Sequence, residues 1–133
     1  MCIEELREKF KNDRFASEAL GAVIDSVREG GSVVSSEITG IMQNAEGGLM
    51  GGAIFTLADF AFAVANYAVE EKAVTLSSSV TFLSTAKGKR LIAEATAIRR
   101  GRKTNCYRVD IHDELGNAIA TATFNGYIVA KPQ

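Results

Sequence analysis

The pattern of hydrophobic and polar positions in the first half of the chain predicts short elements followed by one long helix. Residues 3 to 11 repeat apolar side chains at helical spacing, and residues 15 to 21 indicate a further helical turn that ends at a glycine. Residues 23 to 30 predict an extended segment, and the β-branched side chains of residues 32 to 42 favour a strand. After a loop, residues 51 to 69 predict a long and almost wholly apolar helix.

The second half of the chain has the two-residue period that is typical of strands. From residue 74 to residue 83 the even-numbered positions are mostly apolar and the odd-numbered positions mostly carry hydroxyl groups, which predicts a strand with two different faces. Because tight turns join the runs that follow, these runs are predicted to pair as an antiparallel meander; parallel strands would need crossover helices. The three runs are residues 89 to 100, 104 to 114 and 118 to 130.

A single long apolar helix and five to six long strands have one economical arrangement, in which the sheet curves around the helix and buries it. The predicted fold class is therefore α+β, with the hot-dog architecture of a long central helix wrapped by a curved antiparallel sheet. We expect one domain over residues 1–133, in which residues 1–20 form a short N-terminal helical segment. One sheet leaves edge strands and a helix flank uncovered, so we expect at least a homodimer, and a homotetramer built from two dimers stays open.

Composition and charge narrow the function by exclusion. A net charge of −1, from 15 basic and 16 acidic residues, provides no global field that would draw the chain onto nucleic acid or an anionic membrane surface. Cys2 and Cys106 lack metal-type spacing and favour reduced thiols, and the charged N-terminus lacks the apolar core of a signal peptide. We therefore expect a cytoplasmic protein with no nucleic-acid partner and no bound metal.

The apolar stretch from residue 49 to residue 69 approaches the length of a membrane span. Asp59 would then lie near the bilayer centre, at a cost of about 2.5–3.5 kcal/mol on insertion scales. Asn66 and two glycines weaken the case further, and no flanking basic cluster orients the segment. A helix buried inside protein is the favoured interpretation, and no membrane partner is expected.

Asp59 is the one carboxylate in this helix, and it needs an explanation because burying an unpaired carboxylate costs several kcal/mol. In one interpretation it is structural, either hydrogen-bonded to a neighbour or facing solvent. In the other it is a catalytic base or nucleophile in a water-poor cleft that sets its pKa. The glycines at the helix start favour catalysis, because unobstructed amides at a helix N-terminus can hold an anion or a developing oxyanion.

The spacing of these groups makes a prediction about assembly. Gly51 and Asp59 are eight residues apart, which is about 12 Å along a straight helix. One chain therefore cannot use both groups on a single carbonyl. The hypothesis is a shared site that combines Gly51 of one subunit with Asp59 of the partner subunit across an antiparallel dimer interface.

The motif around the helix start resembles that of the PaaI-like hot-dog thioesterases, close to the acyl-CoA thioesterase 13 type. The resemblance continues in VTFLSTAKG (80–88), RRGRKT (99–104) and DELGNAIATATFNGYI (113–128), and it covers most of the chain from about residue 15. As a set these motifs are fairly specific, whereas each alone is weak. The positions that carry the first motif are Asn44, Ala45, Gly47, Leu49, Gly51, Gly52, Thr56, Leu57 and Asp59.

This resemblance implies hydrolysis of an acyl-CoA thioester, with coenzyme A as part of the substrate and no separate cofactor. It implies that the Gly51 amide polarises the thioester carbonyl and that Asp59 of the partner subunit activates water or attacks directly. Asn44 would orient water or substrate in the same pocket. A hydroxyl at the start of the next strand, Thr75 or with less support Ser77, would hold the attacking water.

The chain departs from the family at Met50, where the family usually has a histidine directly before the two glycines. Methionine cannot donate a hydrogen bond, so a non-catalytic acyl-CoA-binding protein remains the alternative function. Met50 and Gly52 are expected to line the substrate site. Arg102 and Lys103 are expected to contact the phosphates of coenzyme A, although a solvated turn is the other interpretation of this charge run.

Other chemistry has little support in the sequence. His112 is the single histidine and lies at a predicted strand end, which favours a surface residue. The hot-dog dehydratases rely on a histidine near the central helix, so this class is disfavoured. The run Ser77-Ser78-Ser79 is better explained by alternating strand positions than by a serine nucleophile. The sequence does not identify the acyl group.

Overall fold

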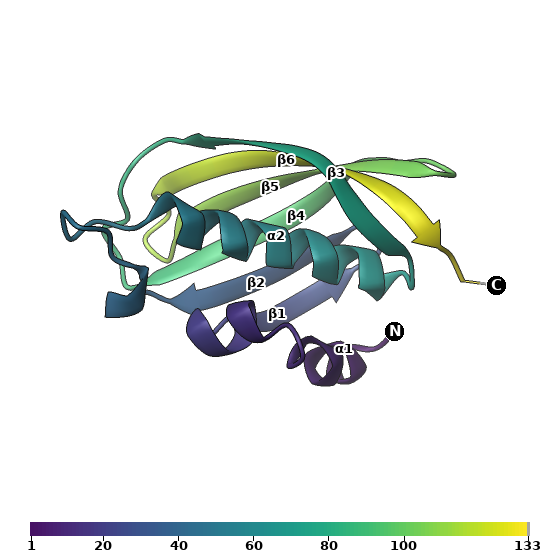
Figure 1. The fold of residues 1–133 in the computed structure, drawn as a ribbon, viewed down its shortest axis with the longest axis horizontal. Coiled ribbons are helices and arrows are strands. Elements are labelled where there is room, and N and C mark those ends of the chain that lie inside the picture. Colours follow the sequence, from purple (N-terminus) through teal and green to yellow (C-terminus); the bar gives the residue numbers. More distant parts are fainter. Residues whose placement is uncertain (133) are drawn as a thin grey trace.

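The computed structural model describes residues 1–132, and Gln133, the last residue of the expected domain, lies outside the described residues. Figure 1 shows a curved sheet wrapped around one long helix, with the N-terminal helices beside one edge of the sheet. The helical elements are α1 (Ile3–Phe10), the π-helical turn η1 (Phe15–Ala19), the 3₁₀ turn η2 (Gly40–Met42) and α2 (Gly51–Ala68). The strands are β1 (Val23–Arg28), β2 (Gly31–Glu37), β3 (Lys72–Phe82), β4 (Arg90–Arg100), β5 (Thr104–Asp113) and β6 (Ala118–Ala130).

The predicted α+β hot-dog fold is confirmed. All six strands pair antiparallel in the order β1-β2-β4-β5-β6-β3, so the predicted meander of the last three runs is present as β4-β5-β6. The place of β3 was not predictable from turn signals, because α2 lies between β2 and β3 in the chain. The helix carries the chain across the sheet, so β3 joins the far edge beside β6, and β4 takes the place next to β2.

The predicted strand over residues 32 to 42 is correct only in its first part. The β2 strand ends at Glu37, and Gly40–Met42 forms a 3₁₀ turn that leads into the loop before α2. The amide of Ile38 still donates to the carbonyl of Lys89, at 2.8 Å, but the chain then leaves the sheet. A run of β-branched residues thus did not specify where the pairing stops.

The predicted alternation along β3 is also wrong at one point. The register of β3 against β6 shifts between Thr75 and Ser77, so Leu76 is an extra residue in the strand. Thr75 pairs with Gly126, whereas Ser77 pairs with Asn125. Paired residues of neighbouring strands share a face, so this bulge places Thr75 and Ser77 on opposite faces of the sheet, although their numbering predicts one face.

The core lies between α2 and the concave face of the sheet. Small side chains such as Ala58 and Ala61 on α2, and Ala93 and Ala95 on β4, are wholly buried and let the helix approach the sheet closely. Phe62 stacks on Phe124, with ring centroids 5.2 Å apart. By length and composition α2 is the one helix among residues 1–132 that could cross a membrane, but here it packs against the sheet as the central helix of the core.

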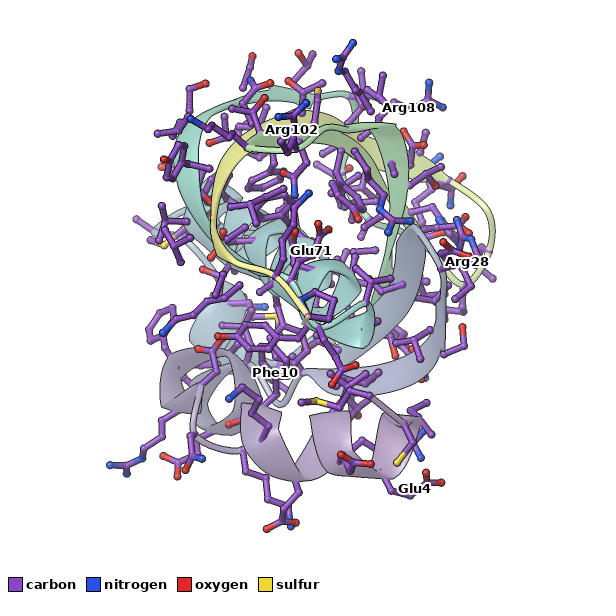
Figure 2. All side chains as sticks on the ribbon, turned by 90° about the vertical axis from the view of Figure 1, so that its right-hand side faces the viewer. Glu4, Phe10, Arg28, Glu71, Arg102 and Arg108 are labelled. Atoms are coloured by element: carbon purple, nitrogen blue, oxygen red, sulfur yellow. The ribbon has the colours of Figure 1, made fainter. Side chains whose placement is uncertain are left out.

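The N-terminal helical segment belongs to the same core cluster. Leu6 is fully buried, and Phe10 is inserted between α1 and α2, where its ring meets Phe60 and Tyr67 edge-on with centroids 5.5 Å apart in both cases. Figure 2 looks along α2 and shows Phe10 between these helices. This packing fixes the N-terminal segment beside the middle of α2, where Asp59 lies.

Candidate active site

The start of α2 offers two unpaired amides. Met50, just before the helix, has an extended backbone, with φ −72° and ψ 131°. Its carbonyl accepts hydrogen bonds from the amides of Ala53, at 3.0 Å, and Ile54, at 3.4 Å. Among residues 1–132, no acceptor pairs with the amides of Gly51 or Gly52. Free N–H groups at a helix N-terminus carry partial positive charge and favour an oxyanion.

Gly51 leaves room for the Phe82 ring beside the start of the helix. A Cβ at position 51 would lie 2.8 Å from Cζ of Phe82, the last residue of β3. The helix start, Phe82 and the segment after it line an open cavity of about 470 Å³, and this size suits a small-molecule group. Its lining residues are Leu49, Gly51, Ile54, Phe82, Leu83, Ser84 and Thr85.

Met50 and Gly52 lie at the edge of this region. Met50 is 52% exposed, and its Cγ and Sδ atoms lie 3.8 Å from the place where Gly52 would carry a Cβ. The thioether therefore covers the open side of the second glycine. It supplies an apolar contact at the position where the sequence resemblance predicts a histidine.

Asn44 shapes the loop that leads to the helix. Its Oδ1 atom accepts the amides of Glu46 at 2.9 Å and Gly48 at 3.0 Å. The loop also contains Gly47 at a positive φ of 81°, which favours glycine. The side-chain carbonyl of Asn44 is thus used to fold the loop. Among residues 1–132, no acceptor pairs with Nδ2 of Asn44, so this donor is available to a ligand.

Asp59 lies in the middle of α2, on the face that the sheet leaves uncovered. Its side chain is exposed in the single chain, together with Gly52 on the same face and the half-buried Thr56 and Ala63. Partial burial of the carboxyl group raises the pKa of Asp59, and the charge of Asp13 raises it further. In the single chain this carboxylate is therefore at a surface, and the water-poor cleft of the catalytic interpretation would require a partner.

The single chain does not bring the expected site residues together. The unbroken helix Gly51–Ala68 keeps the Gly51 amide about 12 Å along its axis from Asp59. The turn between β4 and β5, which holds Arg102 and Lys103, lies near the other end of α2 (Figure 1). These groups can act on one substrate only if a second subunit supplies some of them.

A buried acidic residue lies near the base of the basic turn. Glu71 is 6% exposed and lies between Arg100 and Lys131, with nitrogen–oxygen distances of 3.9 Å and 3.7 Å. Figure 2 shows Glu71 near the end of α2 and Arg102 at the outer margin of the sheet. Arg102 and Lys103 are exposed and form no salt bridge with any carboxylate of residues 1–132.

The bulge in β3 separates the two candidate hydroxyl groups. Thr75 pairs with Gly126, and a Cβ on Gly126 would meet the Phe62 ring of α2 at 2.8 Å, so this is the face toward the helix. Ser77 is on the outer face, where its Oγ accepts from Asn125 Nδ2 at 3.2 Å. This register favours Thr75 as the hydroxyl on the helix side of the sheet.

Sequence reasoning missed two residues at this site. Phe82 covers Gly51, but its position depends on where β3 ends against α2, which no local pattern shows. Asp13 lies close enough to Asp59 to raise the pKa of that carboxyl, although 46 positions separate the two in the chain. Only the packing of the N-terminal segment on α2 reveals that the charge of Asp13 acts on Asp59.

The fold and the helix motif together define a class of protein. A curved antiparallel sheet around one central helix is the hot-dog architecture, and residues 46–120 match the model of the thioesterase superfamily. The chain therefore belongs to the thioesterase superfamily.

Within the thioesterase superfamily, similarity to known proteins places the chain in the PaaI-like group of hot-dog thioesterases. The chain is 34% identical to the acyl-coenzyme A thioesterase PaaI of Escherichia coli K12 over 112 residues, which cover 84% of this chain and 79% of that protein. It superposes with a TM-score of 0.86 on a hypothetical thioesterase protein of Streptococcus pneumoniae TIGR4, solved with coenzyme A, at 26% identity and with 95% and 98% of the two chains covered. A protein of Streptococcus mutans UA159 bound to acetyl CoA gives 0.79, at 28% identity and with 84% and 91% covered.

Proposed function

We propose that this protein is an acyl-CoA thioesterase that hydrolyses a thioester to a free acid and coenzyme A at a site shared by two subunits. The observation that carries the proposal is that one helix, α2, has both the unpaired amides of Gly51 and Gly52 and, on the face that the sheet leaves uncovered, the Asp59 carboxyl group with its raised pKa. An acyl transfer from sulfur to water needs these two elements.

In the proposed reaction, Asp59 of the partner subunit removes a proton from water as the water oxygen attacks the thioester carbon. The carbonyl oxygen becomes an oxyanion and accepts a hydrogen bond from the Gly51 N–H. The C–S bond then breaks, the thiolate of coenzyme A leaves with the electron pair and takes up the proton that Asp59 removed from water, and the free acid remains. Direct attack by Asp59 would reach the same products through an anhydride that water opens. Coenzyme A takes part as a portion of the substrate, and no separate cofactor is proposed.

Thr75, Asn44 and the basic turn would serve this chemistry by positioning. Thr75, on the helix side of the sheet, would hold the attacking water, and the free Nδ2 of Asn44 would orient water or substrate. Arg102 and Lys103 would bind the phosphates of coenzyme A. The likeness to proteins solved with coenzyme A and acetyl CoA supports this substrate class.

A homodimer would complete the site. The β3 strand is an 11-residue edge strand, exposed at nearly every position, and it carries the exposed apolar side chains Val74 and Leu76. A long uncovered edge with apolar side chains invites pairing with another strand. Antiparallel pairing of two β3 strands would bring the Lys72 end of one beside the Phe82 end of the other, and so the basic turn of one subunit toward the Gly51 of its partner. A tetramer and a cytoplasmic location stay predictions.

Met50 favours the second candidate function, a protein that binds acyl-CoA without hydrolysis. An exposed thioether stands where the family has a hydrogen-bond donor, so the carbonyl would lose one polarising contact. Binding through the basic turn and the cavity beside Phe82 does not need this donor. The two candidate functions therefore predict different turnover of acyl-CoA but similar affinity for it.

A thiol-release assay over short, medium, long and aryl acyl-CoA thioesters separates the candidates. The enzyme proposal expects turnover of at least one thioester, and a loss of about 10²–10⁴-fold in kcat for Asp59→Asn with binding retained. The matched control is Asp25→Asn, which changes an exposed carboxyl on β1. Saturable binding of acyl-CoA without turnover by the wild-type protein would favour the second candidate, and Asp59→Asn with full activity would refute the proposed mechanism.

A further inference from the structure

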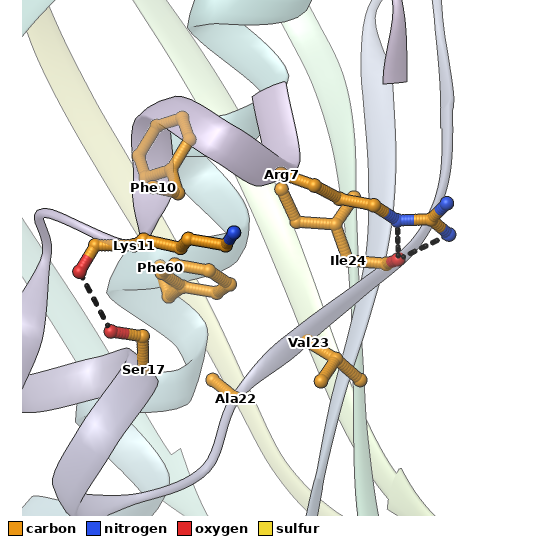
Figure 3. A pocket seen from close by; sticks show the side chains of 8 residues that line it. All are labelled: Arg7, Phe10, Lys11, Ser17, Ala22, Val23, Ile24 and Phe60. Carbon is orange, nitrogen blue, oxygen red and sulfur yellow. Dashed lines mark hydrogen bonds between the residues drawn. The ribbon is translucent and has the colours of Figure 1, made fainter. Parts of the chain in front are cut away.

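A second cavity lies away from the helix start, between α1, η1, β1 and the middle of α2 (Figure 3). Its volume is about 330 Å³, which is within the range of small-molecule sites. No residue that lines it has a part in the proposed reaction. The lining residues are Arg7, Phe10, Lys11, Ser17, Ala22, Val23, Ile24 and Phe60.

The inner wall of this cavity is apolar. The rings of Phe10 and Phe60 meet edge-on, with centroids 5.5 Å apart, and both residues are almost fully buried. Ala22 and Ile24 of the β1 side complete the wall and are also buried. Apart from Ser17, whose hydroxyl donates to the carbonyl of Lys11 at 3.2 Å, this interior offers dispersion contacts and therefore favours an apolar ligand body.

The rim is cationic. Arg7 and Lys11 lie one helical turn apart and both line the cavity, whereas no acidic residue lines it. Nε and Nη2 of Arg7 donate to the carbonyl of Ile24, at 3.1 Å and 2.9 Å, which fixes the guanidinium at the wall. Figure 3 shows the side chain of Lys11 extending past Phe60, with its amino group directed into the space below Arg7.

The two cations are weakly neutralised by the protein. Arg7 forms no salt bridge with any carboxylate of residues 1–132. Lys11 pairs with Glu8 at 2.8 Å, but both side chains are at least 70% exposed, and such surface pairs are worth little. An anionic group at the rim would therefore gain two charge-assisted contacts without displacing a strong one.

We propose that this cavity binds a free monocarboxylic acid with an apolar body of about medium-chain or aryl size. The carboxylate would lie between Arg7 and Lys11, and the body would pack against Phe10 and Phe60. The uncharged acyl chain of a thioester would leave the two cations unused if it entered the cavity, whereas a free acid brings its own carboxylate to them. This binding claim does not rest on the proposed hydrolysis.

Calorimetric titration of the protein with octanoate tests the proposal. We expect saturable binding in the millimolar range or below, and an increase in thermal stability that grows with octanoate concentration. Octanol, which has the same body without the charge, should bind at least tenfold more weakly, equivalent to about 1.4 kcal/mol. Wild-type protein without saturable octanoate binding, or with equal affinity for octanol, would overturn the proposal.

Two variants locate the site. Ala22→Phe fills the cavity and should abolish octanoate binding, and Lys11→Gln removes one cation at an exposed position and should weaken it about tenfold, or about 1.4 kcal/mol. Arg14→Gln is the matched control, because it removes an exposed cation that does not line the cavity, and it should bind like wild type. If Ala22→Phe does not fold, the octanoate affinities of Lys11→Gln and Arg14→Gln still test the site. Equal octanoate affinities of these two variants would contradict the proposal.

Octanoate is also a candidate product of the proposed reaction, so binding at the active site must be distinguished. Gly51→Pro removes the amide proposed for the oxyanion and lies at the other cavity, so it should leave octanoate affinity unchanged. Binding that is lost in Gly51→Pro and kept in Ala22→Phe would assign octanoate to the active site and refute the second site. Failure of the proposed hydrolysis would leave the expected binding pattern unaltered.

Discussion

At the residue scale, Asp59 and Asp13 connect the N-terminal segment to the proposed chemistry. Phe10 and Leu6 anchor α1 on α2, and the segment that follows places Asp13 where its negative charge acts on Asp59. Burial is the larger cause of the raised pKa of Asp59, and Asp13 is the second. A residue with no part in bond making can thus contribute to the raised pKa of the Asp59 carboxyl.

We predict that Asp13→Asn moves the acid limb of the kcat/KM profile to lower pH. Asp59 must be ionised to act as a base, so activity rises as pH increases through its pKa. Removal of the negative charge of Asp13 lowers that pKa and lets ionisation begin at lower pH. The measurement is kcat/KM for one acyl-CoA over a pH series at constant ionic strength.

Glu18→Gln is the control for this profile, since it removes an exposed carboxyl from the same segment that is not a cause of the Asp59 shift. An acid limb that stays in place in Asp13→Asn, or moves to higher pH, would contradict the assignment of Asp59 as the ionising base.

At the element scale, one buried carboxylate holds the β5–β6 turn to the loop before β4. Asp113 is fully buried and accepts five hydrogen bonds, from the amides of Lys87, Gly88, Leu115 and Asn117 and from the Asn117 side chain, at 2.9–3.1 Å. These bonds, above all that from the Asn117 side chain, hold the pKa of Asp113 well below its usual range. The ionised form is therefore the one that the fold requires.

We predict that Asp113→Asn lowers the melting temperature by several degrees between pH 5 and pH 8. The folded-state pKa of Asp113 is depressed, so its stabilising effect is fully present above the ordinary aspartate pKa of about 4 and is lost as pH falls below that value. The difference between wild type and variant should therefore narrow below pH 4. Thermal melts from pH 2 to pH 8, with Asp25→Asn as the exposed control, measure it; a constant difference down to pH 2 would contradict the account.

The elements also show how far the sequence can predict this structure. Period and turn signals located α2 and the meander, because helix period, strand period and glycine turns are local properties. They did not reveal the β3–β6 pairing or the bulge at Leu76, because strand order and register depend on contacts far apart in the chain. As a result, the motif predicts Gly51 and Asp59 as site residues, but it does not separate Thr75 from Ser77, for which the register favours Thr75 as the candidate hydroxyl.

At the scale of the whole molecule, the arrangement of one chain is incomplete as an active site. The Gly51 amide, the Asp59 carboxylate and the basic turn are spread along α2, from one end to the other. The long exposed edge at β3 and the uncovered face of α2 are where a second copy would complete the set. The central claim is therefore that each working site takes its amide from one subunit and its carboxylate from the other.

A matched pair of variants isolates the amide. Gly51 is the first residue of α2, where proline is tolerated, and Met50 before it already has the extended backbone that a following proline requires. Gly51→Pro removes the N–H, whereas Gly51→Ala keeps it and adds a similar contact with Phe82. Activity lost in the proline variant beyond the loss in the alanine variant reports the missing donor.

Subunit mixing of Gly51→Pro with Asp59→Asn tests the central claim most directly. Each variant alone should be inactive, since both sites of its dimer lack one group. After unfolding and joint refolding at equal concentrations, half of the dimers are mixed, and each mixed dimer has one intact site, so thiol release should return to about a quarter of the wild-type rate. A mixture that stays as inactive as the separate variants, with mixed dimers demonstrated to be present, would contradict a site shared between subunits.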